Sequence, residues 1–511
     1  MPDIRSAPAA SQPLARWARL PLAVGTGVLM GLGNAPYDLW YLGLFGVIGA
    51  AWLFMAAPRG LYAVGTGWAV GLGYFGFSLG WIVEPFFVDA AATGWMAPFA
   101  LVGMGGGLAL FWALAFWLAG HARRRPRLAL VLCWTGAEFA RAYVFTGFPW
   151  ALVSYIWAPV APIQLVALVG PHGLTLLTLT VATMFAAAIP RHGLRLLPAL
   201  LGTTSLLLMF GGGHLMTPPL QDIAGRPVAR VIQPNAPQHE KWDPLKIPVF
   251  FDRQIRMTGA PPKDDGALPD LVIWPETSVP MLLHRAADAL GAISLEAGGA
   301  QVVVGIQREE GGNYYNSLVH MDETGDIRDV YDKHHLVPFG EYMPAEHLWT
   351  RWNILGLASR AEGGYSAGPG PYVMDLGADL GKALPLICYE AVFPQDVRGA
   401  PERPDFLMQI TNDAWFGEWS GPYQHLAQAR IRAIEQGLPM LRSANTGVSA
   451  VIDGAGRILA MLPMGEAGFL DAPLPPPLRV TPYSRFGDLP LLALLFLSLL
   501  VFIRPRDTKA D

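Results

Sequence analysis

The sequence predicts an α-helical membrane domain of eight transmembrane helices joined to a separate α/β domain. Of its 511 residues, 52% are hydrophobic and only 15% are charged, whereas soluble domains average about 25% charged residues. Long apolar runs fill residues 20–215 and return at 489–503, with an ordinary globular composition between them. In that middle region, short β-rich runs alternate with helical patterns, which favours the α/β class.

Eight apolar runs make up the membrane part, since a spanning helix needs about 20 mostly apolar residues. Seven candidates precede the globular region and one follows it. They are residues 20–34, 38–56, 62–84, 93–120, 128–145, 162–189, 195–214 and 487–504. The last run is short, but Tyr483, Arg485 and Arg504 can anchor its two ends at the membrane surfaces.

The basic residues predict the direction in which the chain crosses the membrane, because Lys and Arg concentrate in cytoplasmic loops. Basic residues precede the first span, lie in alternate loops and follow the last span: Arg5, Arg16, Arg19, Arg59, 121–127, 191–195 and 504–509. The intervening loops 33–38 and 146–150 carry no Lys or Arg. This pattern predicts cytoplasmic termini and a globular region in the periplasm, in a protein of the bacterial inner membrane.

Three segments follow from this topology. Residues 1–220 form a transmembrane domain of seven helices, residues 221–480 a periplasmic domain, and residues 481–511 a C-terminal transmembrane helix with a cytoplasmic tail. Within the periplasmic domain, alternation and turn residues predict strands and helices. Strands are expected within 227–235, 270–277, 300–307, 316–338, 382–390, 405–413 and 447–462, and helices at 283–296 and 425–437.

Three ionisable side chains follow predicted strands of this domain. Glu276 comes after "VIWP", Lys333 lies in "YDKHHLVPFGEYMP", and Cys388 lies in "LICYE". Ionisable groups at the ends of buried strands are costly to desolvate unless they have partners or a function. A carboxylate can take the proton of a thiol, and an ammonium can stabilise the thiolate and the oxyanion that follows. A cysteine in such a setting is an effective nucleophile toward acyl groups.

The order of Glu, Lys and Cys in these contexts resembles the nitrilase (carbon–nitrogen hydrolase) superfamily. The segments "WPET", "YDKHHLVPFGEYMP", "ICYE" and "TNDAWFG", on a domain that precedes a final span, are similar to bacterial apolipoprotein N-acyltransferases. The segment "FTGFPW" at 145–150 in the membrane part also resembles that family. The resemblance covers nearly the whole chain.

This resemblance implies a reaction, its partners and a fold. Such enzymes take an acyl chain from a membrane phospholipid, usually phosphatidylethanolamine, and hold it as a thioester on the cysteine. They then pass it to the α-amine of an S-diacylglyceryl cysteine at a lipoprotein N-terminus. The implied fold of the outer domain is a nitrilase-like α-β-β-α sandwich.

The resemblance also implies a role for each matching residue. Cys388 is the nucleophile, Glu276 the general base, and Lys333 the group that stabilises the tetrahedral intermediate. Supporting or substrate-binding positions are Glu341, Trp242, Asn316, Tyr389 and Glu390. Trp415, in "TNDAWFG", joins this set as part of a membrane-facing lid that the nearby glycines suggest; the alternative is that Trp415 and Phe416 pack in the core.

Other functions fit parts of the sequence. A membrane-tethered nitrilase-type amidase acting on a soluble amide explains the catalytic residues, but one span would anchor it. A transporter-like or scaffold protein is disfavoured by the complete Glu, Lys and Cys set. A thioester that waits for an amine needs water kept away, and a site facing the bilayer supplies this.

The composition predicts no cofactor, no metal and no nucleic-acid partner. The formal charge is -4, no phosphate-binding loop is present, and Cys133 and Cys388 are far apart. The adjacent His334 and His335 would face opposite sides of a strand, so they cannot easily share one ion. We expect a monomer.

Three further positions have competing interpretations. Cys133, inside the fifth span, is interpreted as a packing residue. Glu138 and Arg141 share one helix face in that span and form either a mutual ion pair or a site for a lipid headgroup. His425 opens an amphipathic helix and is interpreted as a cap or surface residue.

Overall fold

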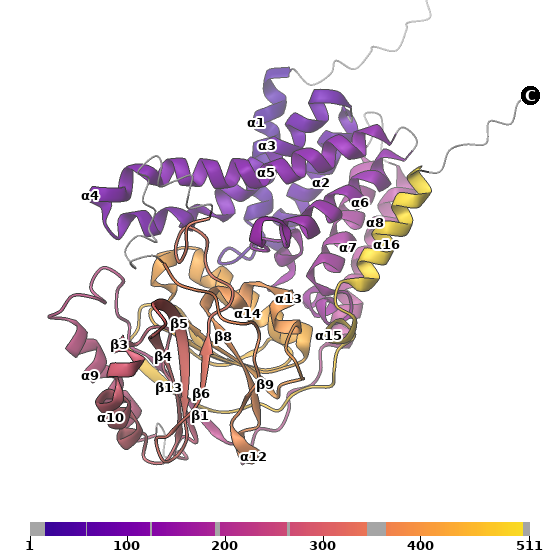
Figure 1. The fold of residues 1–511 in the computed structure, drawn as a ribbon. Helices are drawn as coiled ribbons and strands as arrows, with labels where there is room; N and C mark the ends of the chain where they lie inside the picture. The colour runs from indigo at the N-terminus through magenta and orange to yellow at the C-terminus, as the bar shows by residue number, and fades with distance from the viewer. Residues whose placement is uncertain are drawn as a thin grey trace, which may run out of the picture.

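The computed structural model describes residues 16–57, 59–122, 125–189, 195–262, 266–344 and 364–503. A bundle of helices from the N-terminal part of the chain lies against a β sandwich, and the C-terminal helix returns to the bundle (Figure 1). Arg5 and most of the basic clusters at 191–195 and 504–509, on which the predicted orientation partly rests, lie outside the described residues.

Each of the eight predicted spans contains a helix. These helices are α1 (Arg16–Gly31), α2 (Trp40–Ala56), α3 (Gly60–Ser78), α5 (Ala97–His121), α6 (Pro126–Arg141), α7 (Val166–Ala188), α8 (Leu196–Met216) and α16 (Leu489–Ile503). Among the described residues, three helical stretches are long and apolar enough to cross a bilayer: Ala90–His121, Ala161–Ala188 and Leu196–Met216. A fourth results if α3 and the short helix η1 (Gly80–Phe87), which meet at a bend of 48°, count as one span.

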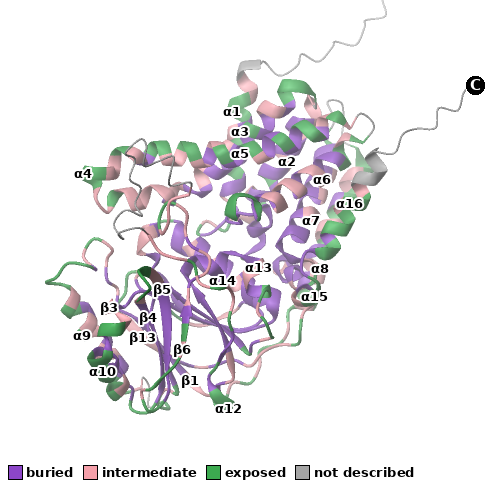
Figure 2. Ribbon diagram, viewed as in Figure 1, coloured by how far each residue is buried: buried purple, intermediate pink, exposed green. Residues whose placement is uncertain are grey.

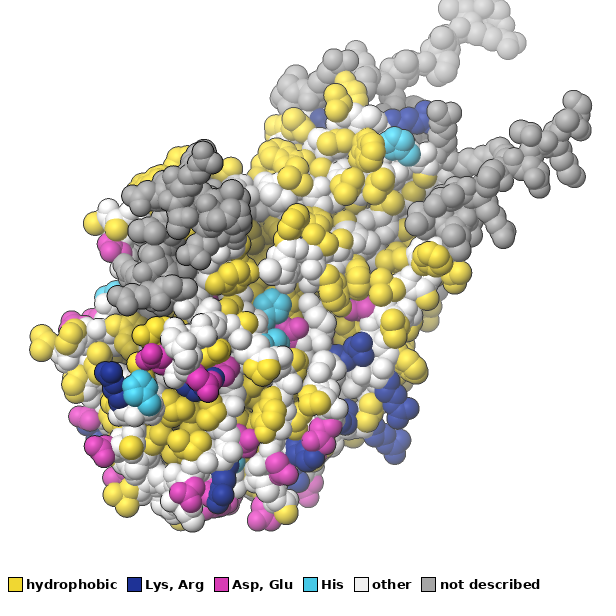
Figure 3. All heavy atoms as spheres, in the orientation of Figure 1, with side chains coloured by type: hydrophobic (Ala, Val, Ile, Leu, Met, Phe, Trp, Pro, Cys, Tyr) yellow, Lys and Arg dark blue, Asp and Glu magenta, His cyan; other side chains and the backbone are white. Residues whose placement is uncertain are grey.

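Large apolar side chains cover the outer faces of these helices. Leu110 and Leu114 of α5 and Leu207 and Leu208 of α8 are all more than half exposed, as is Phe496 of α16. Figure 2 shows exposed residues along α5 and α16, and Figure 3 shows hydrophobic side chains over the helical part while most charged side chains gather on the sandwich. An apolar surface of this extent needs a lipid environment, so the protein is membrane-bound.

The charged pair in α6 is buried within the helical part. Glu138 and Arg141 are 0% and 1% exposed, and Arg141 Nη2 lies 3.1 Å from Glu138 Oε2. Trp112 Nε1 donates to Glu138 Oε1 at 2.8 Å, and Arg141 Nη1 donates to the carbonyl of Trp150 at 2.8 Å. The ion-pair interpretation is therefore confirmed, and the pair also holds the backbone of the "FTGFPW" segment.

The sandwich consists of two mixed sheets. The first has the order β13-β1-β2-β4-β5-β6, with β3 paired to β4, and the second has the order β12-β11-β10-β9-β8-β7. The strands of the first sheet are β1 (Val228–Gln233), β2 (Leu271–Ile273), β3 (Val279–Leu282), β4 (Gln301–Glu310), β5 (Asn313–Met321), β6 (Ile327–Asp332) and β13 (Gly468–Pro473). Those of the second are β7 (Met374–Asp375), β8 (Lys382–Ile387), β9 (Phe406–Thr411), β10 (Met440–Ala444), β11 (Ser449–Ile452) and β12 (Ile458–Leu462).

Alternation along the strands builds four layers, because successive side chains point to opposite faces of a sheet. On β4, Val303 belongs to the core between the two sheets, while Val302 and Val304 pack with α10 (Ala287–Ala297). On β8, Leu384 and Leu386 pack with α14 (Gly421–Gln436) on the opposite outer face. The α-β-β-α arrangement expected for the outer domain is therefore present.

Contacts of Gln424 and Tyr483 are among those that connect the helical bundle to the rest of the chain. Gln424 of α14 accepts a hydrogen bond from Trp150 Nε1 at 2.7 Å and donates to the carbonyl of Ser78 at 3.0 Å. Gly170 interrupts α7 with a φ of 68°, and a Cβ there would lie 2.1 Å from the ring of Tyr483. Only glycine leaves room for the ring of this tyrosine, which packs against α7 and belongs to the segment that leads to α16.

Candidate active site

The proposed catalytic side chains lie at one edge of the two sheets. Glu276 follows β2 by three residues, Lys333 directly follows β6, Cys388 directly follows β8, and Asn412 directly follows β9. β6 runs in the same direction as β2 because it is antiparallel to β5, which is antiparallel to β4, and β4 is parallel to β2. The carboxyl ends of the strands in each sheet therefore meet, and they bring residues from distant parts of the chain together.

Two hydrogen bonds hold the Glu276 carboxylate, one from each sheet. Asn316 Nδ2 donates to Oε1 at 2.7 Å, and the backbone N–H of Asn412 donates to Oε2 at 2.7 Å. Glu276 is only 6% exposed. A Cβ on Gly305 of β4 would lie 2.7 Å from the Glu276 Cα, so this turn packs closely against a strand that has no side chain there. The carboxylate is therefore fixed in position.

Lys333 joins Glu276 to a second carboxylate. Its Nζ lies 3.6 Å from Glu276 Oε1 and 2.8 Å from Glu341 Oε2. Asn316 Nδ2 also donates to Glu341 Oε1, at 3.1 Å. Burial lowers the pKa of Lys333, but the charges of Glu341 and Glu276 and the neighbouring Cys388 raise it more, so its pKa stays above the ordinary value. Lys333 is therefore a permanent positive charge, and Glu276, Lys333, Glu341 and Asn316 form one connected cluster.

Cys388 sits in a strained turn at the end of β8. Its φ is 53°, in the left-handed region that non-glycine residues avoid, and the residue is 5% exposed. Burial raises the pKa of its thiol above the ordinary value, Glu276 raises it further, and Lys333 and Thr411 lower it. The resting thiol is therefore protonated at neutral pH, and its use as a nucleophile requires a base at the moment of attack.

Comparisons with known proteins match both parts of this architecture. Residues 26–184 match the apolipoprotein N-acyltransferase N-terminal domain, and residues 265–480 match the carbon-nitrogen hydrolase family. An apolipoprotein N-acyltransferase of Caulobacter vibrioides is 40% identical over 521 residues, and one of Rhodopseudomonas palustris is 38% identical over 518 residues. Both alignments cover 96% of this chain and 96% of the relative.

The chain belongs to the apolipoprotein N-acyltransferase family. The resemblance that the motifs indicated is confirmed, and the sandwich is the carbon-nitrogen hydrolase fold.

Glu390 holds the backbone next to two of the proposed catalytic residues. It is fully buried, and its Oε1 accepts from the backbone N–H of His334 at 2.7 Å and from the Tyr331 hydroxyl at 2.8 Å. Its Oε2 accepts from the backbone N–H of Ile387 at 2.7 Å. Glu390 thus ties the segment after Lys333 to the residue before the nucleophile.

Tyr389 is buried beside the same segment. Its ring lies 4.8 Å from that of Phe393 and 5.6 Å from that of His335, edge-on in both cases. Tyr389 and Glu390 therefore both lie against the nucleophile turn, and their supporting role stays a prediction.

A second lysine, Lys241, reaches the site and was missed by the sequence analysis. Its Nζ donates to the carbonyl of Glu276 at 3.1 Å and to Thr277 Oγ1 at 2.7 Å. Burial lowers the pKa of Lys241 to about 8, against the opposing effects of Glu276 and Cys388. The only signal in the sequence was its place before Trp242, whose ring lies 5.5 Å from the ammonium.

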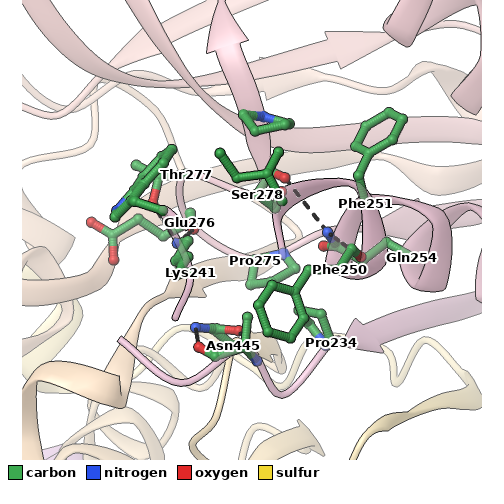
Figure 4. A pocket seen from close by; sticks show the side chains of 14 residues that line it. Pro234, Lys241, Phe250, Phe251, Gln254, Pro275, Glu276, Thr277, Ser278 and Asn445 are labelled. Atoms are coloured by element: carbon green, nitrogen blue, oxygen red, sulfur yellow. Dashed lines mark hydrogen bonds between the residues drawn. The ribbon is translucent and has the colours of Figure 1, made fainter. Parts of the chain in front are cut away.

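Lys241 and Glu276 also line a pocket beside the site (Figure 4). Phe250 and Gln254, from α9 (Ile247–Thr258), line its other side, and Trp242 borders it while remaining 41% exposed. The cavity is small, about 20 Å³, so as it stands it has room for about one water molecule.

The segment around Trp415 contacts the helical part. Trp415 is half-buried in the short helix η10 (Asp413–Phe416), and Phe416 is 8% exposed with its ring 4.8 Å from that of Trp81. Phe416 therefore packs as a core aromatic, the alternative considered for it. The lid role of Trp415 stays a prediction.

His425 was interpreted as a cap or surface residue, and this was wrong. It is 0% exposed, its Nδ1 lies 2.9 Å from Asp413 Oδ1, and its Nε2 lies 3.1 Å from the carbonyl oxygen of Cys388. The amphipathic pattern of α14 indicated a solvent-facing side, but sheet and membrane helices cover both of its faces.

The adjacent histidines also differ from expectation in their placement. β6 ends at Asp332, so His334 and His335 are not on opposite faces of a strand; both lie near Asp396, at 3.6 Å and 2.7 Å. Within the described ranges, no cluster of three or more His, Cys, Asp or Glu side chains has the arrangement of a metal site.

Proposed function

We propose that the protein transfers an acyl chain from a membrane phospholipid, through a thioester on Cys388, to the N-terminal α-amine of S-diacylglyceryl-cysteine lipoproteins. Family membership makes it an acyltransferase of lipoprotein maturation. The observation that carries the mechanism is the cluster of Glu276, Lys333 and a buried thiol at one edge of the sandwich. That edge is close to the membrane part, since His425 touches the Cys388 carbonyl and lies 5.6 Å from the Trp150 ring.

The first half-reaction charges the cysteine. Glu276 takes the thiol proton as the sulfur attacks an ester carbonyl of the phospholipid, and Lys333 stabilises the oxyanion that forms. The intermediate collapses to a thioester, and the departing lysophospholipid oxygen takes the proton back from Glu276. The fixed carboxylate and the permanent charge of Lys333 suit these two roles.

The second half-reaction removes the acyl chain from Cys388. The lipoprotein α-amine attacks the thioester carbonyl, Lys333 again stabilises the oxyanion, and Glu276 accepts a proton from the nitrogen. The sulfur leaves and takes the proton from Glu276, which gives the amide and restores both the thiol and the carboxylate. Glu341, Asn316 and Trp242 support this chemistry by holding Lys333 and Glu276 and by bordering the adjacent pocket.

A substrate experiment tests this function. Purified protein mixed with phosphatidylethanolamine and no acceptor is expected to gain one fatty-acyl mass on Cys388, removable by neutral hydroxylamine, and to release lysophospholipid. A diacylated lipopeptide with a free N-terminal amine is expected to discharge it to an amide, while the N-acetylated lipopeptide leaves it charged. The measurement is intact-protein and peptide mass.

The opposite outcome distinguishes the amidase function. If no lipid mass forms and ammonia is released from small soluble amides, the protein is a membrane-tethered hydrolase, and the transfer mechanism is wrong.

We further propose the membrane arrangement that this reaction needs. Residues 1–220 and 481–511 cross the inner membrane in eight spans, and residues 221–480 form a periplasmic catalytic domain. The alternation of basic loops with loops that carry no Lys or Arg supports this orientation. The enzyme needs no cofactor and acts as a monomer with phosphatidylethanolamine as its usual donor.

Thiol labelling checks the orientation. In a background of Cys133→Ala and Cys388→Ser, a cysteine at Leu295, which is 80% exposed on α10, is expected to react with a membrane-impermeant reagent in intact spheroplasts. A cysteine at Arg195, in a predicted cytoplasmic loop, is expected to react only after lysis. Labelling in the reverse pattern would contradict the orientation and with it the periplasmic reaction.

A further inference from the structure

A closed polar cluster lies directly behind the nucleophile and has no role in the mechanism above. It consists of Gln409 of β9, Asp413 of η10, His425 of α14 and Arg442 of β10, and all four side chains are 0% exposed. Burying two charged groups and two polar groups together is costly unless hydrogen bonds and ion pairs satisfy them. We call this set the carbonyl network, because its hydrogen bonds converge on the backbone carbonyl of Cys388.

Gln409 is the member that supplies a hydrogen to this carbonyl. Its Nε2 donates to the Cys388 oxygen at 3.1 Å, and its Oε1 accepts from Arg442 Nη1. Because a guanidinium can only donate, Arg442 fixes which end of the Gln409 amide carries the oxygen. The amide nitrogen must then point toward the nucleophile turn.

His425 fixes the same amide from its other side. Its Nδ1 lies 2.9 Å from Asp413 Oδ1, and since a carboxylate only accepts, the proton lies on Nδ1. Burial lowers the pKa of His425, so the ring is neutral and its Nε2 is an acceptor. That nitrogen lies 3.0 Å from Gln409 Nε2 and 3.1 Å from the Cys388 carbonyl oxygen. Because an unprotonated nitrogen cannot donate, its hydrogen-bond partner is Gln409, whose second hydrogen it accepts, and the carbonyl takes its hydrogen from Gln409 alone.

Asp413 closes the network. Its Oδ2 accepts from Arg442 Nη2, and its Oδ1 also accepts from the Thr411 hydroxyl at 2.9 Å. Every hydrogen of the Gln409 amide therefore has a defined direction, and a single donor faces the Cys388 carbonyl.

The turn that this donor holds is strained. Cys388 has a φ of 53°, and a non-glycine residue keeps such a conformation only where its surroundings hold it there. Rotation of the Cys388 peptide toward an ordinary φ would swing the thiol away from Glu276 and Lys333. The hydrogen bond to the carbonyl opposes that rotation.

We propose that Gln409 is a positioning residue for the acyl-transfer reaction: oriented by Arg442 and by the His425–Asp413 pair, it holds the Cys388 carbonyl so that the thiol stays beside Glu276 and Lys333. This inference rests on the proposed function, in which Cys388 is the nucleophile. Gln409 touches no substrate and acts only through the cysteine.

The network also receives contacts from the lipid side of the molecule. The His425 ring lies 5.6 Å from that of Trp150 in the membrane part and 5.5 Å from that of Phe416 in the loop after β9. Part of the packing around His425 therefore comes from the helical part of the molecule and from the loop that contacts it.

The test compares turnover with thiol placement. Gln409→Met keeps the side-chain volume but removes both amide groups. We expect kcat for acyl transfer to fall about 100-fold, the loss that a misplaced reacting group can cause, with KM for both substrates nearly unchanged. Without substrate, the pH–rate profile for alkylation of Cys388 should shift by about half a pH unit or more, because the thiol moves relative to Glu276 and Lys333.

A matched control and a second pair of variants complete the test. Gln428→Met removes a buried amide from a different element, α14. The polar atoms of this amide have no hydrogen-bond partner among the described residues, so this variant should leave kcat and the alkylation profile unchanged. If Gln409→Met does not fold, the pair His425→Gln and His425→Leu decides. The glutamine can still donate to Asp413 and accept from Gln409, and we expect it to retain kcat that the leucine loses.

The inference is overturned if folded Gln409→Met protein keeps the wild-type kcat and alkylation profile, or if His425→Gln and His425→Leu behave alike. A loss that only follows the unfolded fraction, with normal turnover per folded molecule, also overturns it. Failure of the proposed function is distinguishable, because it would appear in the wild-type enzyme as the absence of a fatty-acyl mass on Cys388 after exposure to phosphatidylethanolamine.

Discussion

Cys388→Ser is expected to lower acyl transfer by at least roughly 10⁴-fold, as loss of the nucleophile does in enzymes with covalent intermediates. A hydroxyl is far harder to deprotonate than a thiol, and the same Glu276 cannot activate it at neutral pH. The change removes little volume from a residue that is 5% exposed, so the fold should persist. The measurements are amide formation from lipopeptide and the mass of any acyl-enzyme.

The second cysteine provides the matched control for this variant. Cys133 lies half-buried in α6, away from the sandwich. Cys133→Ala should therefore transfer acyl chains at the wild-type rate. Transfer by the Cys388→Ser enzyme within tenfold of wild type would remove Cys388 from the mechanism.

The site was predictable where chemistry coincides with strand ends. Glu276 and Cys388 each follow a run of apolar, β-favouring residues, and such runs indicate buried strands whose carboxyl ends carry function. Lys333 instead follows the mixed and half-exposed strand β6, so only its motif context singled it out. The end of the helix predicted at 425–437 is confirmed, since α14 stops at Gly437, which is left-handed, but the helix begins at Gly421, four residues before the predicted start.

The remaining contributions could not be predicted because they depend on tertiary packing. Lys241 approaches Glu276 from a loop that precedes α9. The helix α9 itself was not predicted from the sequence. Gln409 interrupts an apolar strand, and only the fold shows that it faces the nucleophile. β10 and β13 were also not predicted: β13 pairs with β1, at the other end of the domain's sequence, and β10 lies between β9 and β11 in the second sheet.

The burial of the polar face of α14 could not be predicted either. Its residues Gln424, Gln428 and Arg432 follow each other at intervals of one turn, a spacing that is typical of a solvent-facing side. All three are buried, and Gln424 and Arg432 bond to the helical bundle through Trp150 and Tyr155. A periodic pattern shows only which face of a helix is polar. In α14 that polar face packs against other parts of the protein instead of facing water.

Glu276→Gln is expected to change two properties of the enzyme in opposite directions. Acyl transfer should fall roughly 10²- to 10⁴-fold, the usual contribution of a general base. Alkylation of Cys388 by a small neutral reagent should instead become faster at neutral pH. The negative charge of Glu276 raises the pKa of the thiol, so its removal leaves a larger thiolate fraction beside Lys333.

The sign of this second effect separates the base from a structural residue. Burial raises the pKa of Cys388, so wild-type alkylation should climb with pH beyond neutral, and in Glu276→Gln the same climb should begin at lower pH. A residue that only supports the fold would slow both reactions or leave both unchanged. Lys333→Met serves as the matched comparison: it removes a charge that lowers the thiol pKa, so both alkylation and transfer should become slower. If Glu276→Gln retains transfer close to wild type, another group is the base, and Glu341, 2.8 Å from Lys333 Nζ, is the first to examine by the same pair of measurements.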